Sequence, residues 1–336
     1  MHFRPIEVSP RVAKLLALLA WGYLALSVGY AALLWLGGDA WWPATVLLFV
    51  PRWPLLLPAP LLGIVVGLIR PRLLVPLTLG ALISLGPAMG YRLGWRSWVG
   101  GSTPRDLRII TFNVRGAENP QLLAIPQGLE VYQPDIVVFQ ECAEELLDSA
   151  YWPAGWTLRS EQGLCLATRF PVLQARTLER VLTGEQGGTG NAVFYRLGTA
   201  AAPIDLGIIH LETPRKGLEP LRYGARIEAM KRNVLVRDVG SRRLSRWLRE
   251  QSASVIVAGD FNMPVESTIY RTHWGGCRNA FSAVGHGFGW TRVLPHFSLR
   301  IDHVLSCGGW RPLRASVGPD LGSDHLPLIV DLARKE

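Results

Sequence analysis

The sequence predicts an α/β domain made of two packed sheets with helices on the outside, preceded by a region of membrane-spanning helices. Two observations predict this architecture. Up to about residue 100 the 336-residue chain is dominated by apolar residues, and beyond it charged residues spread out as in a soluble domain. In this second part, strand-like runs interleave with helical segments, as is typical of α/β domains. We therefore expect a membrane region over residues 1–100 and a second domain over 101–336, with the boundary at 100–104.

The N-terminal region contains three apolar segments. Residues 15–36 form an uncharged run of twenty-two residues, close to the ~20 that a helix needs to cross a bilayer. A signal peptide is the rival interpretation, but its apolar part is typically only ~7–15 residues long, and no small-residue cleavage site follows this run before Trp41. Residues 73–91 form a second uncharged run. Between them, residues 44–69 are interrupted by four prolines and Arg52, which predicts a kinked or shortened span.

Basic residues near these segments predict the orientation, because loops rich in Lys and Arg tend to stay in the cytoplasm. Arg4, Arg11 and Lys14 place the N-terminus inside. Three spans then place the residues after about 95 outside the cytoplasm, whereas two spans reverse this placement, and Arg92 and Arg96 follow the last run. We expect an integral, multi-pass protein of the cell membrane whose second domain is extracytoplasmic.

The basic pI near 9.8 of the whole chain does not describe the second domain. Residues 1–100 hold eight Lys or Arg against two acidic residues, so the remainder carries 27 basic and 24 acidic residues, a net charge of +3. A nearly neutral domain does not require a nucleic acid as its partner.

The four cysteines are too few and too scattered for a disulfide scaffold, and no Cys-x-x-Cys pair suggests zinc. Cys142 and Cys165 each lie on or next to a predicted core strand. If the domain is exported, they form a candidate disulfide, and two buried free thiols are the alternative.

The second domain contains many short strand-like runs, several of them apolar on both faces, which predicts strands buried on both sides. The predicted strands are 107–113, 135–140, 163–168, 191–196, 204–210, 254–259, 301–305 and 326–330. The predicted helices are 121–132, 143–150 and 223–251.

Polar side chains that can do chemistry adjoin these apolar runs. They are Asn113, Gln140 and Glu141, His210, Asp260 and Asn262, Asp302 and His303, and Asp324 and His325. A turn or cap residue is the ordinary explanation for any one of them. Six separate apolar runs adjoining such side chains instead predict a shared site, because strand ends converge in α/β scaffolds.

Six motifs follow one another in a recognisable order. They are TFNVRG (111–116), FQE (139–141), HLE (210–212), GDFN (259–262), IDHV (301–304) and SDHLPL (323–328). In order and spacing they resemble the endonuclease/exonuclease/phosphatase superfamily, over roughly residues 106–333. This superfamily includes deoxyribonuclease-like nucleases, abasic-site endonucleases, inositol polyphosphate phosphatases and neutral sphingomyelinases. The resemblance implies a four-layer α/β sandwich with its site at one edge of the two sheets.

The resemblance also implies a site for Mg²⁺ or Mn²⁺. Glu141 would be the principal ligand, with Asn113 beside it, and Asp324 would complete the site or reach the ion through water. These residue types suit the chemistry, because a hard cation prefers oxygen ligands and Mg²⁺ is commonly held by one or two carboxylates plus substrate phosphate.

The catalytic roles are likewise implied by the resemblance. His325 would be the general base that takes a proton from the attacking water, with Asp302 bonded to its other ring nitrogen. Asp260 would orient the water or serve a second metal ion. Asn262 would donate a hydrogen bond to the phosphoryl oxygens, and His210 would stabilise the developing charge or protonate the leaving oxygen.

These inferences predict a membrane-anchored, divalent-metal-dependent hydrolase of phosphoric esters, a phosphodiesterase or phosphatase. A substrate at the bilayer, such as a phospholipid head group, is favoured because tethering raises its effective concentration. One alternative is a membrane-tethered nuclease acting on DNA or RNA, against which the nearly neutral charge weighs. Another is an inactive membrane scaffold, although all six motifs keep chemically competent residues. No obligate protein partner is inferred.

Overall fold

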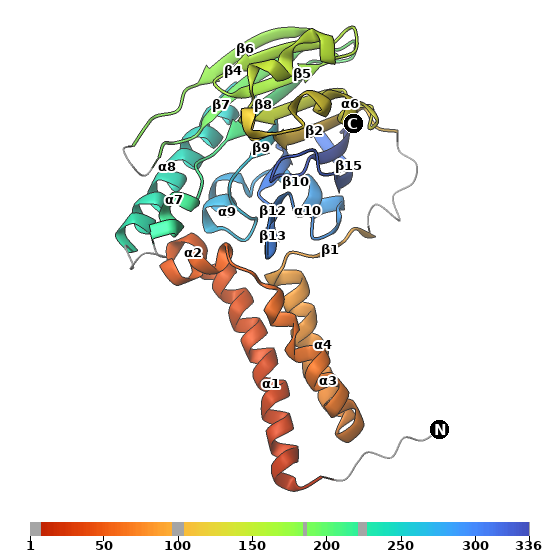
Figure 1. Ribbon diagram of the computed structural model, residues 1–336, viewed down its shortest axis with the longest axis vertical. Coiled ribbons are helices and arrows are strands. Elements are labelled where there is room, and N and C mark those ends of the chain that lie inside the picture. Colours follow the sequence, from red (N-terminus) through yellow and green to blue (C-terminus); the bar gives the residue numbers. More distant parts are fainter. Residues whose placement is uncertain (1–7, 96–103, 184–186, 221–226, 336) are drawn as a thin grey trace. The chain divides into compact units, whose positions relative to one another are not determined.

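The computed structural model describes residues 8–95, 104–183, 187–220 and 227–335 (Figure 1). The chain divides into two compact units, residues 1–92 and 93–336. The boundary expected at 100–104 lies almost wholly outside the described residues. Each unit is described by itself.

The N-terminal unit is helical. Its α-helices are α1 (Pro10–Ala32), α2 (Trp42–Leu48), α3 (Pro58–Ile69) and α4 (Leu74–Ile83), and π-helical turns at Leu33–Gly37 and Ser84–Ala88 extend α1 and α4. Helix α1 begins where Ser9 accepts a hydrogen bond from the Val12 amide and Pro10 occupies the first turn, two ordinary features of a helix start.

Two helical stretches of this unit, Pro10–Ala40 and Pro71–Ala88, are long and apolar enough to cross a membrane. A third candidate, Trp42–Leu48 with Trp53–Ile69, is bent by 84° at its break. The prolines between residues 51 and 60 account for the bend, because proline disrupts a helix interior. The kinked middle segment predicted from the sequence is therefore confirmed as a structural feature.

The second unit contains, within the described residues, two six-stranded mixed sheets packed face to face (Figure 1). The first has the order β15-β16-β2-β3-β5-β4 and the second the order β10-β14-β9-β8-β7-β6. The strands of the first sheet are β2 (Leu107–Asn113), β3 (Ile136–Gln140), β4 (Thr157–Glu161), β5 (Leu164–Thr168), β15 (Trp310–Val317) and β16 (Leu328–Arg334). Those of the second are β6 (Val172–Leu178), β7 (Asn191–Leu197), β8 (Ile204–His210), β9 (Ile256–Asp260), β10 (Arg278–Asn279) and β14 (Asp302–Ser306).

The helices of this unit are α6 (Ile125–Glu130), α7 (Arg215–Leu218), α8 (Ile227–Gln251), α9 (Thr268–Trp274) and α10 (Ala280–Val284). Helix α6 packs on the outer face of the first sheet, α8 and α9 pack on the outer face of the second, and α10 packs into the central cluster between the sheets. The short strands are β11 (His286–Gly287), β12 (Arg292–Leu294) and β13 (Phe297–Leu299), of which β12 and β13 form a hairpin. Strand β1 (Arg92–Leu93) spans the point in the chain where the two units divide.

Three apolar clusters produce the layers. Alternate residues of a strand point to opposite faces, so Ile109 of β2 packs between the sheets while Ile110 packs beneath α6. On the second sheet, Ile208 of β8 enters the central cluster, and Ile209 packs in the cluster that contains Leu244 of α8. Burial on both faces explains the continuous apolar runs. The predicted four-layer sandwich is confirmed.

Some local predictions were wrong. The helix expected over 143–150 is two short 3-10 turns, Glu144–Leu147 and Ser149–Tyr151, because the Asp148 side chain caps the second turn and interrupts the helix. Strands β4, β6 and β15 were not predicted, and neither were the short strands β1, β10, β11, β12 and β13. The first two are partly exposed edge strands whose polar residues mask the strand pattern, and β15 contains a bulge next to Pro312.

Both cysteine pairs form disulfides. Cys142 is bonded to Cys165, which selects the first of the two alternatives that the sequence left open. Cys277 is bonded to Cys307, a pair that was not predicted.

Candidate active site

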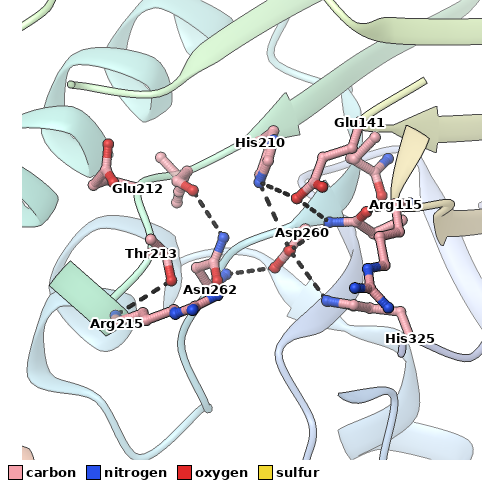
Figure 2. A network of polar contacts seen from close by, with 12 residues as sticks. Arg115, Glu141, His210, Glu212, Thr213, Arg215, Asp260, Asn262 and His325 are labelled. Carbon is pink, nitrogen blue, oxygen red and sulfur yellow. Dashed lines mark hydrogen bonds and ion pairs between the residues drawn. The ribbon is translucent and has the colours of Figure 1, made fainter. Parts of the chain in front are cut away.

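Most of the predicted site residues gather at one edge of the two sheets, and Figure 2 shows Glu141, His210, Asp260, Asn262 and His325 close together there. In the first sheet β2 and β3 run parallel, so Asn113 lies beside Gln140 and close to Glu141. In the second sheet β8 and β9 run parallel with His210 beside Asp260, and the antiparallel strand β14 brings Asp302 to the same position.

Asn113 connects the two sheets. Its Nδ2 donates to Oε1 of Glu141 at 3.0 Å and to Oδ2 of Asp260 at 3.1 Å. The same Oδ2 lies 3.8 Å from Nε2 of His210 and 3.8 Å from Nε2 of His325, and His210 Nε2 lies 3.7 Å from Glu141 Oε1. The Asp260 carboxylate is therefore at the centre of the site, as Figure 2 shows.

His325 is held by Asp302. Its Nδ1 lies 2.8 Å from Oδ2 of Asp302, and both side chains are buried. Because one ring nitrogen is fixed by the carboxylate, Nε2 is the nitrogen that faces the site and can accept a proton. This arrangement suits a general base with an orienting carboxylate.

Burial and neighbouring charges shift the pKa values of these groups. Burial and the charge of Asp302 raise the pKa of Asp260. Burial acts to raise the pKa of Asp302 also, but the charge and hydrogen bond of His325 outweigh it and leave that pKa below its usual value. Burial acts to lower the pKa of His325, yet the charges of Asp302 and Asp260 prevail and raise it to about 9. Shifts of this kind are common at catalytic sites.

Two residues of the site have left-handed backbone conformations. Glu141 has φ 50° and Asn262 has φ 52°, values that ordinary side chains rarely adopt and that cluster at functional sites. The Asn262 amide N–H donates to Oδ1 of Asp260, and its side-chain Nδ2 donates to the carbonyl of Leu211. Nδ2 carries a second hydrogen that can bind a further acceptor. Gly259 is required before Asp260, since a Cβ there would lie 2.0 Å from the Ile209 carbonyl oxygen.

Asp324 has a different environment from the other predicted ligands. Its Oδ2 lies 2.6 Å from Nη2 of Arg292, and both side chains are partly exposed. Its role as a metal ligand stays a prediction.

The structure adds positioning residues that sequence reasoning missed. Oγ1 of Thr291 accepts hydrogen bonds from the amides of Ile301 and Asp302. Ser323 Oγ donates to the Asn113 carbonyl and accepts from the His325 amide, linking two motifs. Ser323 was visible inside SDHLPL, whereas Thr291 lies before β12 and no motif marked it.

Two further polar residues are structural. Glu212, within the HLE motif, is buried and pairs with Arg180 and Lys216. His303 is buried, its Nε2 lies 3.0 Å from the Met263 carbonyl oxygen, and burial lowers its pKa to about 3, so it stays neutral. Leaving His303 out of the catalytic set agrees with this environment.

The donor atoms fit a hard divalent cation. Ligand atoms of Asp260, Asp302 and His325 lie within 4.8 Å of one another, but Nδ1 of His325 and Oδ2 of Asp302 already bind each other. The half-exposed carboxylate of Glu141 faces the same centre. Burial, together with repulsion from Asp302, raises the pKa of Asp260, and a bound cation would oppose both effects. An oxygen-rich set of this kind suits a hard divalent cation.

A four-layer sandwich with acidic residues and histidines at its sheet edge defines a class of phosphoric ester hydrolases. Residues 110–325 match the model of the Endonuclease/Exonuclease/phosphatase family. The chain belongs to this family, whose members hydrolyse phosphate esters and generally depend on divalent metal ions.

Solved structures share the fold. An endonuclease/exonuclease/phosphatase from Bacteroides vulgatus is 17% identical with a TM-score of 0.52, over 69% of this chain and 100% of that one. A mannosyl-6-phosphatase from Bacteroides thetaiotaomicron is 14% identical with a TM-score of 0.50, over 68% and 100%. TDP2 from D. rerio complexed with a single-strand DNA product is 17% identical with a TM-score of 0.51, over 68% and 98%. A search of curated proteins found no match.

The pair of His325 and Asp302 predicts a specific pH effect. A base must be neutral to act, and the Asp302 charge raises the pKa of His325. In Asp302→Asn, His325 therefore stays neutral to lower pH, while loss of its orienting carboxylate lowers the maximum kcat/KM by about tenfold or more. We expect the acid limb of the kcat/KM profile at saturating Mg²⁺ to move to lower pH.

Asp205→Asn is the matched control for this profile. Asp205 lies near the start of β8, at the opposite end from His210, and pairs with Arg196. Its replacement should leave the limb in place. A limb that stays fixed in Asp302→Asn would contradict the assigned pair.

Proposed function

We propose that this protein is a membrane-anchored hydrolase of phosphoric esters that uses Mg²⁺ or Mn²⁺ and acts outside the cytoplasm on a phospholipid head group. The observation that carries the proposal is the buried pair of His325 and Asp302. Nε2 of His325 faces Asp260, which Asn113 links to Glu141.

The residues of the chain divide the chemistry among themselves. Nε2 of His325 takes a proton from the attacking water, Asp302 stabilises the imidazolium that forms, and Asp260 orients the water. The remaining hydrogen on Nδ2 of Asn262 binds a phosphoryl oxygen, and His210 stabilises or protonates the leaving oxygen. Glu141 and Asn113 would hold the divalent ion, with Asp324 directly or through water, and the ion would supply positive charge that offsets the charge of the phosphoryl group.

Two features support a location outside the cytoplasm. Both disulfides lie in the second unit, and disulfides persist mainly in oxidising compartments. The N-terminal unit holds two candidate spans, or three if the bent pair is counted, and three spans from a cytoplasmic N-terminus place the second unit outside. A tethered enzyme meets lipid head groups at high effective concentration.

Ion pairs around the site also favour a compact substrate over a nucleic acid. Among the described residues near the motifs, Arg115 pairs with Glu118, Arg215 with Glu219, and Arg292 with Asp324. Paired arginines form a weaker electrostatic track for a polyanion than unpaired ones. A nuclease is the alternative, and a panel of lipid and nucleic-acid substrates distinguishes the two.

The test uses the full chain purified in detergent. We expect hydrolysis of bis-p-nitrophenyl phosphate in Mg²⁺ or Mn²⁺ and its loss with EDTA, and turnover insensitive to EDTA would refute the mechanism.

A panel of sphingomyelin, phosphoinositides, plasmid DNA and RNA then identifies the substrate class, and preference for DNA or RNA would replace the lipid proposal by the nuclease. Alkaline phosphatase fused after residue 100 should be active, and an inactive fusion would reverse the orientation.

A further inference from the structure

The chain that carries Glu141 is closed into a small ring. Strand β3 pairs with β5 so that Phe139 lies opposite Cys165 and Gln140 opposite Leu164. After Glu141 the chain turns back, and Cys142 forms its disulfide with Cys165. The strand pairing and the disulfide together therefore enclose Glu141 between two fixed points, one on each side of it.

The backbone conformation of Glu141 is one that neighbouring contacts must hold in place. Its φ of 50° is left-handed, a conformation that a glutamate does not favour by itself. The Cys142 amide donates to the Gly163 carbonyl at 3.0 Å, and Cys165 is completely buried in the cluster beneath α6. Together these contacts fix the direction in which the chain leaves β3.

The side chain of Glu141 is held far less firmly than its backbone. It is 48% exposed, with Nδ2 of Asn113 at 3.0 Å and Nε2 of His210 at 3.7 Å. The position of the Glu141 carboxylate must therefore be set mainly by the backbone at Glu141, and hence by the disulfide of the next residue, Cys142.

We infer that the Cys142–Cys165 disulfide is a positioning device that holds the Glu141 carboxylate at the centre of the site, so that cation affinity depends on it. This inference rests on the proposed function, in which Glu141 is the principal metal ligand. Partners that orient metal ligands commonly change metal affinity by about 10- to 100-fold when removed.

The second disulfide supplies a matched control. Cys307 directly follows β14, whose first residue is Asp302, and its amide bonds to the carbonyl of Val255 just before β9. Cys307 is five residue steps along the strand from Asp302, about 16 Å at the usual rise. Cys277–Cys307 therefore lies at the opposite end of these strands from the site.

The test compares two paired variants of the full chain in detergent, Cys142→Ala with Cys165→Ala and Cys277→Ala with Cys307→Ala. Mn²⁺ binding is measured directly by titration calorimetry, alongside the Mg²⁺ concentration for half-maximal turnover. For the first pair we expect both constants to rise about tenfold while kcat at saturating metal is kept. For the second pair we expect no change. Unchanged affinity in the first folded variant, or equal losses in both, would overturn the inference.

A further measurement covers the case in which the first variant does not fold. In the Cys277→Ala/Cys307→Ala background, dithiothreitol reduces Cys142–Cys165 to two thiols and is itself oxidised to its cyclic disulfide. After desalting, the reduced protein should bind Mn²⁺ about tenfold more weakly than the oxidised protein, and equal binding would contradict the inference. A wild-type protein that binds no Mn²⁺ would instead refute the proposed metal site itself.

Discussion

Replacing His325 with alanine is expected to lower kcat for bis-p-nitrophenyl phosphate by about 10²- to 10⁴-fold, the usual contribution of a positioned general base. Nε2 of His325 is the basic atom that the structure directs towards Asp260, and Asp302 occupies its other nitrogen. With the imidazole gone, water must lose its proton to solvent. The measurement is kcat and KM at saturating Mg²⁺, with the loss appearing in kcat.

Controls separate this chemical loss from a loss of structure. His325→Ala leaves the buried carboxylate of Asp302 without its partner, which destabilises the fold. His325→Gln keeps a donor for Asp302 but no base, so it should fold better and remain as inactive. His286→Ala removes an exposed histidine of β11 and should keep full activity. Substantial turnover in folded His325→Gln would exclude His325 as the base.

The centre of the site could be predicted from sequence because it uses regular elements. Apolar runs that are buried on both faces identify the strands, and strand ends converge on one edge of the sheets. His210 and Asp260 accordingly lie side by side through strand register, and Asn113 reaches Asp260 through a hydrogen bond between the two sheets.

Other parts depend on contacts between segments that the local pattern does not encode. The pairing of Arg292 with Asp324 arises from the β12–β13 hairpin, whose backbone bonds to the segment before His325. Cys277 and Cys307 meet only because α9, β10 and β14 are packed together. Edge strands such as β6 carry polar residues on their exposed face, so their composition resembles that of loops.

Replacing Glu141 with glutamine is expected to raise the Mg²⁺ concentration for half-maximal activity by about 100-fold or more, because the principal ligand loses its charge. Asp324→Asn should raise it by only about tenfold, since Arg292 already engages the Asp324 carboxylate and contact through water suffices for the ion. Glu145→Gln, at an exposed glutamate four residues further on, should leave it unchanged.

The ratio of these effects distinguishes two metal sites. If the ion binds at Glu141 and Asn113, Mn²⁺ titration should show a much larger loss of affinity in Glu141→Gln than in Asp324→Asn. The cluster of Asp260, Asp302 and His325 is the other geometric candidate, and binding there would leave the affinity of Glu141→Gln close to that of the wild type. Because the second result leaves Glu141 without a ligand role, it would also remove the reason for its left-handed backbone to be held beside a disulfide.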